Sequence, residues 1–392
     1  MKYLKIENIL LNSKRYIPIS KEKSKINLNN NKHYKLRTIF IFIFIFIISL
    51  SLFIISNKIY KNNNILEIYS NNQNKDRNEF INKLKDILNF NEIFENEMMN
   101  KHTTFRIGGP AKYFTRPKTV YQILEIIKLC TKFKVNFFIL GNGSNLLVSD
   151  NGYDGVIIQI KEDNFSNLEI IKKDENNYSL IVGGGMLMKT LSIEACMLSL
   201  TGLEDIIDIP GTIGGGIIMN ASFRGTGLRK PLSKVKIITP EGDIKELTKE
   251  ECKLTNRGSM LKDKKYIVIE AIFNLTKGDP MIIQKKMTNN TKMRYEKQPM
   301  YFGSAGSFFQ WNYNKHGSIY EKYKESNLVS YRIGNSMIYT YNIAFIVNLG
   351  NATASNVMEI VAHITKIMKE RYNIDMIREV IIIGKINGVE YY

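Results

Sequence analysis

Four glycine-rich turns are the first places in this sequence where chemistry could occur. Glycine permits positive φ and lets backbone N–H groups come close to an anion, and Ser144 and Asn145 add hydroxyl and amide donors. No Walker Gly-Lys-Ser/Thr motif occurs, nor a G-x-G-x-x-G between a strand and a helix. One such turn alone would be a plain turn, but four together favour a large phosphate-bearing cofactor. They are Ile107–Pro110, Gly141–Asn145, Val182–Gly185 and Pro210–Gly216.

A second candidate for chemistry is the segment Gly303–Phe309, which reads GSAGSFF. Ser307 lies there between small residues and two aromatic residues, so it could be exposed on a turn beside an apolar wall. A serine hydroxyl is a poor acid unless its alkoxide is stabilised, which favours protonation of a strongly basic carbanion over hydrolysis. Taken by itself, however, the segment is best interpreted as a Gly/Ser turn before a strand.

Cysteine and histidine give no sign of a metal or disulfide site. Cys130, Cys196 and Cys252 are far apart and no C-x-x-C occurs, so neither a disulfide framework nor a zinc site is expected. The four histidines are too dispersed for a metal site, and no local signature of a Ser-His-Asp triad is present. We therefore expect no metal.

The charge is strongly basic, with 55 Lys and Arg against 37 Asp and Glu, a net charge of +18. Such an excess raises nucleic acid or an acidic membrane surface as a partner. Much of it lies in the first eighty residues, and the rest is Lys scattered among Asn and Ile, as in an AT-rich coding sequence. We therefore expect no nucleic-acid partner, and note that a diphosphate-bearing ligand would use the same positive field.

Composition divides the N-terminal region into a basic leader (1–38), an apolar segment (39–56) and a low-complexity segment (57–91). The apolar segment has no charge and lies at the short limit for crossing a bilayer, where about 20 residues are typical. The basic residues before it predict a cytoplasmic N-terminal side. We expect either a membrane anchor or a cleaved signal, with 57–91 as a spacer or a plastid-type transit segment. The protein would then be membrane-associated or organelle-targeted, or cytoplasmic if its catalytic domain faces the cytosol.

From near Glu92 onward, strand and helix patterns occur in every third of the chain, which predicts an α+β fold. Thr119 is expected to begin a helix through Cys130, and Asn356 a final helix through Met368, followed by a strand over Met376–Ile383. Further strands are expected at Val135–Leu140, Val156–Ile160, Ser179–Val182, Val235–Ile238 and Tyr266–Leu275, and a helix at Leu187–Leu198.

Taken in order, these motifs resemble the UDP-N-acetylenolpyruvoylglucosamine reductase (MurB) family from about residue 95 to 385. LGNGSNLLV is similar almost letter for letter to the family's cofactor loop, and GSAGSFFQ after Lys297-Gln298-Pro299 resembles its catalytic turn. Each motif alone is weak, but the ordered set is specific. The similar segments are His102–Ala111, Leu140–Val148, Thr201–Glu204, Ile209–Gly216, Met219–Ala221, Asn256–Ser259, Gly303–Gln310, Phe345–Ala354 and Glu379–Gly384.

The resemblance implies a two-subdomain FAD-binding module of the PCMH type followed by a MurB C-terminal substrate-binding domain. The expected bounds are 92–160 and 161–280 for the two FAD-binding subdomains and 281–392 for the substrate domain. No long insertion with a substrate-capping Tyr follows Phe309, so the chain is more similar to the family's shorter type II. A monomer is expected.

The implied reaction uses non-covalent FAD and NADPH to reduce UDP-N-acetylglucosamine enolpyruvate to UDP-N-acetylmuramate, a peptidoglycan precursor. Ser307 matches the proton donor, Glu379 the acidic partner, and Arg257 a guanidinium that would stabilise charge on the substrate carboxylate. The positions that match the family's cofactor contacts are Arg106, Gly141, Asn142, Gly143, Ser144, Asn145, Leu146, Pro210, Gly211, Thr212, Gly214, Gly215, Asn220 and Ala221.

Several departures from the family pattern leave two alternatives open. Asn256 stands where the family usually has Tyr, Tyr339–Asn342 replaces a Ser-x-x-His segment, and Leu228–Lys230 replaces an acid. The chain could be another FAD-linked oxidoreductase of the same cofactor fold, for which His102 would be the one residue in the loops able to tether flavin. It could also be a membrane-anchored flavin-binding protein with degraded catalysis.

Overall fold

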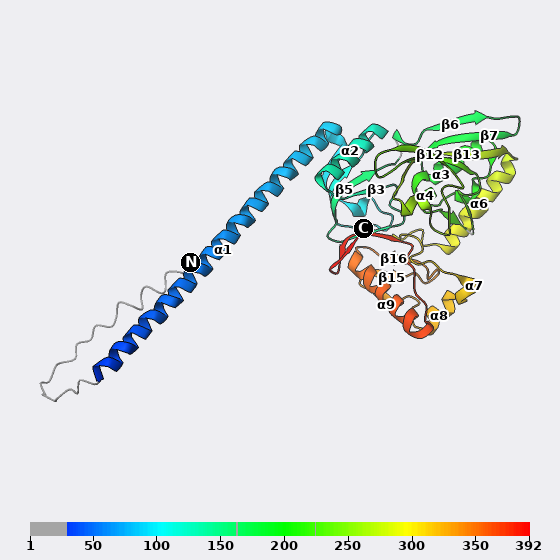
Figure 1. Ribbon diagram of the computed structural model, residues 1–392. Helices are drawn as coiled ribbons and strands as arrows, with labels where there is room; N and C mark the ends of the chain where they lie inside the picture. The colour runs from blue at the N-terminus through cyan, green and yellow to red at the C-terminus, as the bar shows by residue number, and fades with distance from the viewer. Residues whose placement is uncertain (1–29, 162–163, 224) are drawn as a thin grey trace. The chain divides into compact units, whose positions relative to one another are not determined.

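The computed structural model (Figure 1) describes residues 30–161, 164–223 and 225–392, except for some side chains of the first helix. The chain forms two units, 1–75 and 76–392. In the first unit the described residues belong to helix α1 (Asn30–Ile87), so the expected low-complexity spacer is helical. No helix in the described part of the chain is long and apolar enough to cross a membrane, and the expected span at 39–56 is not supported.

The second unit begins at Asp76, earlier than the expected start near Glu92. Phe80, Leu84 and Leu88 recur at helical spacing on the last turns of α1 and just beyond it, and all three are buried. They pack against Tyr113 and the apolar residues of the following helix. This amphipathic end of α1 therefore belongs to the folded core.

The first sheet has the order β1-β2-β5-β3, with β1 antiparallel to β2 and the other pairs parallel. Helix α2 packs on it through Ile123, Ile126 and Ile127. As predicted, Thr119 caps this helix, because its side chain accepts a hydrogen bond from Gln122 N. The bounds are η2 Phe90–Glu92, β1 Ile93–Met98, η3 Met99–Lys101, β2 Pro110–Thr115, α2 Val120–Phe133, β3 Phe137–Leu140 and β5 Tyr153–Gln159.

The second sheet is antiparallel, with the order β12-β11-β13-β7-β6 and β8 paired to β13. Helices α3, α4 and α6 lie with this sheet (Figure 1), and the sheet and helices α3 and α4 enclose a separate apolar core. The bounds are β6 Leu168–Lys172, β7 Asn177–Gly183, α3 Met188–Met197, β8 Leu200–Thr201, η5 Glu204–Ile206, α4 Ile213–Ile218, β9 Ser222–Phe223, β10 Thr226–Gly227, β11 Leu232–Ile238, β12 Ile244–Thr248, α5 Met260–Asp263, β13 Ile267–Lys277 and α6 Pro280–Lys297.

The C-terminal region packs α9 against a three-stranded sheet, β14-β15-β16 (Figure 1), and returns to the first half of the chain through β17. Strand β17 pairs in parallel with β4, with Ile381 opposite Leu146. This pairing joins the expected catalytic strand directly to the expected cofactor loop. The bounds are β4 Leu146–Val148, α7 Tyr313–His316, α8 Ile319–Glu325, β14 Arg332–Ile333, β15 Ser336–Ile338, β16 Ile346–Asn348, α9 Ala354–Tyr372, β17 Ile381–Ile386 and β18 Val389–Tyr391.

Two expected boundaries in this region were wrong. Thr353, not Asn356, caps α9, because the Thr353 side chain accepts a hydrogen bond from the backbone N–H of Asn356. The strand expected over Met376–Ile383 begins at Ile381. The segment before it makes an isolated bridge between Phe309 and Arg378, so its hydrogen bonds go to the serine turn instead of a sheet.

Candidate active site

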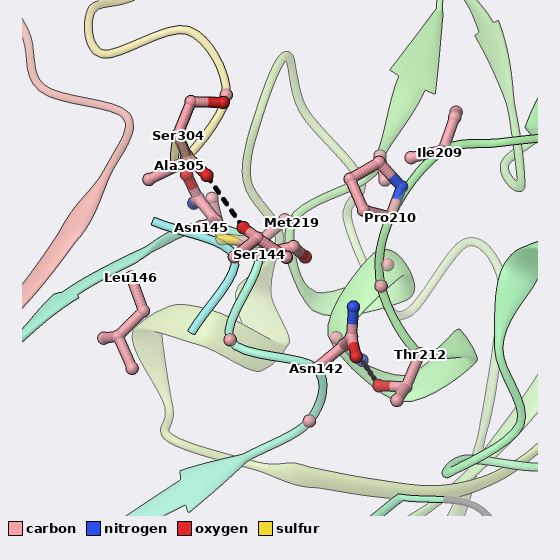
Figure 2. Close-up of a pocket in the computed structure, with 18 of the residues that line it drawn as sticks. Asn142, Ser144, Asn145, Leu146, Ile209, Pro210, Thr212, Met219, Ser304 and Ala305 are labelled. Carbon is pink, nitrogen blue, oxygen red and sulfur yellow. Dashed lines mark hydrogen bonds between the residues drawn. The ribbon is translucent and has the colours of Figure 1, made fainter. Parts of the chain in front are cut away.

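A cavity of about 620 Å³ gathers two of the four glycine-rich turns, Gly141–Asn145 and Pro210–Gly216, together with the segment that carries Ser307. No residue of the other two turns, Ile107–Pro110 and Val182–Gly185, lines it. Figure 2 shows the loop after β3 on one side, the loop before α4 on another, and Ser304 and Ala305 on a third. Arg257, Ser307 and Glu379 all line the same cavity. The expected cofactor residues that line it are Arg106, Gly141, Asn142, Gly143, Ser144, Asn145, Leu146, Pro210, Gly211, Thr212, Gly215 and Ala221.

The loop after β3 forms a cradle of backbone groups. Gly143 has φ of 63°, and a Cβ there would overlap the carbonyl of His102, so only glycine fits without strain. A Cβ on Gly141 would meet Thr212 Oγ1. In the part of the chain that the structure describes, the backbone N–H groups of Asn142, Gly143 and Ser144 have no acceptor. These donors are free to bind an anionic or carbonyl oxygen of a ligand.

The loop before α4 closes the opposite side. Gly211 has φ of 147°, and the Thr212 side chain caps α4 by accepting a hydrogen bond of 3.3 Å from Gly215 N. Gly214 and Asn220, which the resemblance assigned to the cofactor, do not line the cavity. Gly214 N donates to the carbonyl of Gly184, and Asn220 Nδ2 donates to the carbonyl of Thr255. Both residues support the loop rather than face the space it encloses.

Ser307 is held by strand-like contacts on both sides. It forms an antiparallel bridge with Phe345, and the next residue, Phe308, donates its N–H to Ala344 O and accepts from Glu379 N at 2.9 Å. Gly306 precedes it with φ of 80°, a value that glycine adopts readily. Ser307 is partly exposed, and within the described chain its hydroxyl has no hydrogen-bond partner. The hydroxyl is therefore available to a bound molecule.

Arg257 and Glu379 form an ion pair, with 3.3 Å between Nε and Oε1. Arg257 has φ of 61°, unusual for a residue with a side chain, and its Nη1 atom donates to the carbonyl of Ser222. Burial raises the pKa of the Glu379 carboxyl above its ordinary value, although the charges of Arg257 and Lys262 act in the opposite direction. The pair thus offers a partly buried acid beside a fixed cation.

The cofactor loop and the segment around Glu379 are hydrogen-bonded to each other. Asn145 Nδ2 donates to the Glu379 carbonyl at 3.1 Å, and Ile381 N donates to the Asn145 carbonyl at 3.1 Å. Thr104 adds a second link, because its hydroxyl donates to the carbonyl of Ser304. Segments far apart in the sequence therefore hold Ser307 and Glu379 in fixed positions relative to the loop.

Comparison with known proteins is decisive. A family model described as an FAD binding domain matches residues 111–248, and one described as the C-terminal domain of UDP-N-acetylenolpyruvoylglucosamine reductase matches residues 298–383. A UDP-N-acetylenolpyruvoylglucosamine reductase of Lachnoclostridium phytofermentans is 34% identical over 309 residues, which cover 79% of this chain and 98% of that protein. The chain belongs to the UDP-N-acetylenolpyruvoylglucosamine reductase (MurB) family.

Other members of the MurB family are similar to this chain in sequence and in structure. The reductase of Alkaliphilus metalliredigens is 36% identical over 295 residues, covering 75% of this chain and 94% of that protein. The crystal structure of the MurB enzyme from Thermus caldophilus has a TM-score of 0.60 at 27% identity, covering 73% of this chain and 97% of that one. The predicted α+β fold, an FAD-binding domain followed by a MurB C-terminal domain, is confirmed.

The cavity also contains a residue that the sequence analysis missed. Arg294 on α6 lines it, is only 5% exposed, and within the described residues has no hydrogen-bond partner for its Nε. Its guanidinium lies 5.2 Å from the centre of the Phe223 ring. Burial lowers its pKa to about 10, so it remains charged at neutral pH. A buried cation with an unused donor fits a ligand with negative or carbonyl oxygens, such as FAD.

The side chain of His102 bears on the alternative of a covalently tethered flavin. The ring of His102 stacks on Phe114 with 4.2 Å between centroids, and its Nε2 lies 2.9 Å from Glu97 Oε1. Burial lowers the pKa of this histidine. His102 therefore has a structural role in the MurB fold, packing the opening motif onto β2.

Among the residues that the structure describes, no cluster of His, Cys, Asp or Glu could hold a metal ion.

Proposed function

We propose that this chain reduces UDP-N-acetylglucosamine enolpyruvate to UDP-N-acetylmuramate, with NADPH as the reductant and non-covalently bound FAD as the cofactor, in peptidoglycan precursor synthesis. The observation that carries the proposal is the common cavity. Ser307, Arg257 and Glu379 line the same space as the glycine cradle of the FAD-binding domain. The names of the relatives, all UDP-N-acetylenolpyruvoylglucosamine reductases, support the choice of substrate.

Bound FAD, once reduced by NADPH, would supply the hydride that is added to the enolpyruvyl double bond. In our proposal Arg257 then binds the substrate carboxylate, where negative charge grows as the carbanion or enolate forms. Ser307 gives its hydroxyl proton to the carbanion carbon, which is the carbon bonded to the carboxylate, and Glu379 assists this transfer. The raised pKa of Glu379 supports this role, because the carboxyl keeps its proton to a higher pH than an ordinary carboxyl does.

We further propose that 92–160 and 161–280 act as the two cofactor subdomains and 281–392 as the substrate domain. The hydrogen bonds from Asn145 to Glu379 and from Thr104 to Ser304 support this arrangement, because both join the first cofactor subdomain to the substrate domain. Residues outside the cavity, such as Gly214 and Asn220, would act by supporting the FAD loop.

The test is NADPH oxidation by the purified FAD-loaded protein, with and without UDP-N-acetylglucosamine enolpyruvate. We expect a substrate-dependent rate. Ser307→Ala should retain flavin reduction by NADPH but lose substrate-dependent reoxidation by about 10²–10⁴-fold, the range of general acid catalysis. Ser233→Ala, a serine on β11 outside the cavity, is the matched control. A wild-type protein with bound FAD and no substrate-dependent rate would refute the proposal.

A further inference from the structure

An exposed aromatic residue stands at the edge of the cavity. Phe138, Phe302 and Phe345 are the aromatic residues that line it in the described chain. Phe138 and Phe345 are buried, but Phe302 is 41% exposed. An apolar ring that reaches from a binding cavity into solvent is costly to leave uncovered and is suited to a ligand that extends out of the cavity. Phe302 comes directly before the turn that carries Ser307.

Two tyrosines continue this surface. The Tyr339 ring lies 6.2 Å from that of Phe302, and the Tyr341 ring lies 5.6 Å from that of Tyr339. Tyr341 is 80% exposed. We call these three residues the aromatic rim. They belong to the Tyr339–Asn342 segment and the Ser307 turn, and neither tyrosine has a role in the proposed chemistry.

The backbone fixes the aromatic rim relative to the reaction site. Tyr339 N donates to Phe345 O at 2.9 Å, and Phe345 is the residue paired with Ser307. Asn342 Nδ2 donates to the Lys297 carbonyl at 2.9 Å, which ties the tyrosine turn to the end of α6. Backbone hydrogen bonds therefore join the rim to the residue that pairs with Ser307, and the rim extends the surface that begins at Phe302.

We propose that the aromatic rim binds the nucleobase of the nucleoside diphosphate sugar by stacking. The inference rests on the proposed function, because in that substrate the base lies at the opposite end from the reacting double bond. If the enolpyruvyl group meets Ser307 inside the cavity, the base must lie towards its edge. Flat aromatic rings stack on nucleobases whatever the identity of the base. The rim begins at Phe302, which lines the cavity and is exposed, and continues outward from it through Tyr339 and Tyr341.

The test uses FAD-loaded protein and two probes, UDP and inorganic pyrophosphate, measured by isothermal titration calorimetry. The Tyr339→Ala/Tyr341→Ala double variant should raise the Kd for UDP about five- to tenfold or more, the range seen for loss of base stacking. Its Kd for pyrophosphate should not change, because pyrophosphate has no base. The corresponding Phe variants should bind UDP as the wild type does. Tyr121→Ala, an exposed tyrosine on α2, is the matched control.

Turnover gives a second readout. In the double Ala variant the KM for UDP-N-acetylglucosamine enolpyruvate should rise by the same factor while kcat is unchanged, because stacking at the far end of the substrate is equal in the ground and transition states. Unchanged UDP affinity, or an equal loss of pyrophosphate affinity, would overturn the inference. A wild type that binds UDP but shows no turnover would overturn the proposed function instead, so the two failures are distinguishable.

Discussion

The Arg257 Nε atom lies 3.3 Å from Oε1 of Glu379, and this ion pair joins the middle of the chain to the segment just before β17. The two side chains line one cavity with Ser307, although the sequence separates all three widely. The charge of Arg257 opposes the effect that burial has on the Glu379 carboxyl. The pKa of Glu379 is therefore set by two opposing effects, burial and the positive charge of Arg257. Removal of the Arg257 charge should leave the effect of burial less opposed.

Replacement of Arg257 should alter the pH dependence of catalysis. In Arg257→Met, burial acts on Glu379 with less opposition, so the pKa of the carboxyl rises further. If protonated Glu379 assists the reaction, the fall of kcat at high pH should move to higher pH. We also expect kcat to drop about 10²–10³-fold, because a donor to the developing charge is lost. Arg229→Met, at an exposed site, is the control, and a profile that moves to lower pH would contradict the prediction.

Replacement of Glu379 should change the pH dependence of stability. Its pKa is raised in the folded protein, so between the ordinary value and the raised one the folded state binds more protons than the unfolded state. The free energy of unfolding of the wild type therefore falls as pH rises through that window. Glu379→Gln lacks this loss, so the FAD-free variant should gain stability relative to the wild type as pH rises through the window. Urea unfolding at several pH values measures this, and Glu175→Gln, in an exposed turn, should show no such trend.

Replacement of Arg294 should separate cofactor binding from stability. Arg294→Met keeps an apolar stem of similar length but removes a buried charge whose Nε has no partner in the described chain. The melting temperature of the FAD-free protein should stay the same or rise, because burial of the charge is costly and outweighs the attraction of Asp208. The Kd for FAD, measured by quenching of flavin fluorescence, should rise about 10-fold or more through loss of a charged hydrogen bond. If FAD affinity is unchanged, Arg294 does not contact the cofactor.

Asp150 should stabilise the attachment of the last helix. Its carboxylate accepts hydrogen bonds from Ala354 N at 2.7 Å and Ser355 N at 3.0 Å, at the start of α9. We expect Asp150→Ala to lower the free energy of unfolding by about 1–2 kcal/mol, as for loss of a helix cap. Asp154→Ala removes an exposed ion pair with Lys112 and should cost about 0–1 kcal/mol. Equal losses of unfolding free energy in the two variants, measured by urea unfolding, would show that the Asp150 contacts stabilise the fold no more than the exposed ion pair does.

Local features of the chain were predictable from its sequence. The Thr119 cap follows from side-chain chemistry within one turn of helix, and the helix after it from apolar residues at helical spacing. The glycine turns at Gly141–Asn145 and Pro210–Gly216 follow from the same kind of local constraint, because only glycine adopts those backbone angles or allows such close approach. Motif order then identified the family.

Helix α6 was not predicted, and its burial explains why. The side chains it buries are Ile283, Asn290 and Arg294, so it has no apolar face for periodicity to reveal. It is held by polar contacts, such as Asn290 Nδ2 to the Glu204 carbonyl and Thr291 Oγ1 to Asp208. A local signal was present, since Asp279 before a proline is typical of a helix start, and Asp279 does cap the helix.

The family, the glycine loops and the candidates Ser307, Arg257 and Glu379 could all be recognised from short segments of sequence, because each depends on local requirements. Tertiary structure alone decided what those residues meet. The parallel pairing of β4 with β17 and the hydrogen bond from Asn145 to Glu379 join segments far apart in the chain. Burial, which raises the pKa of Glu379 and leaves Arg294 with an unused donor, depends on every element packed around the cavity. No local pattern encodes those two properties.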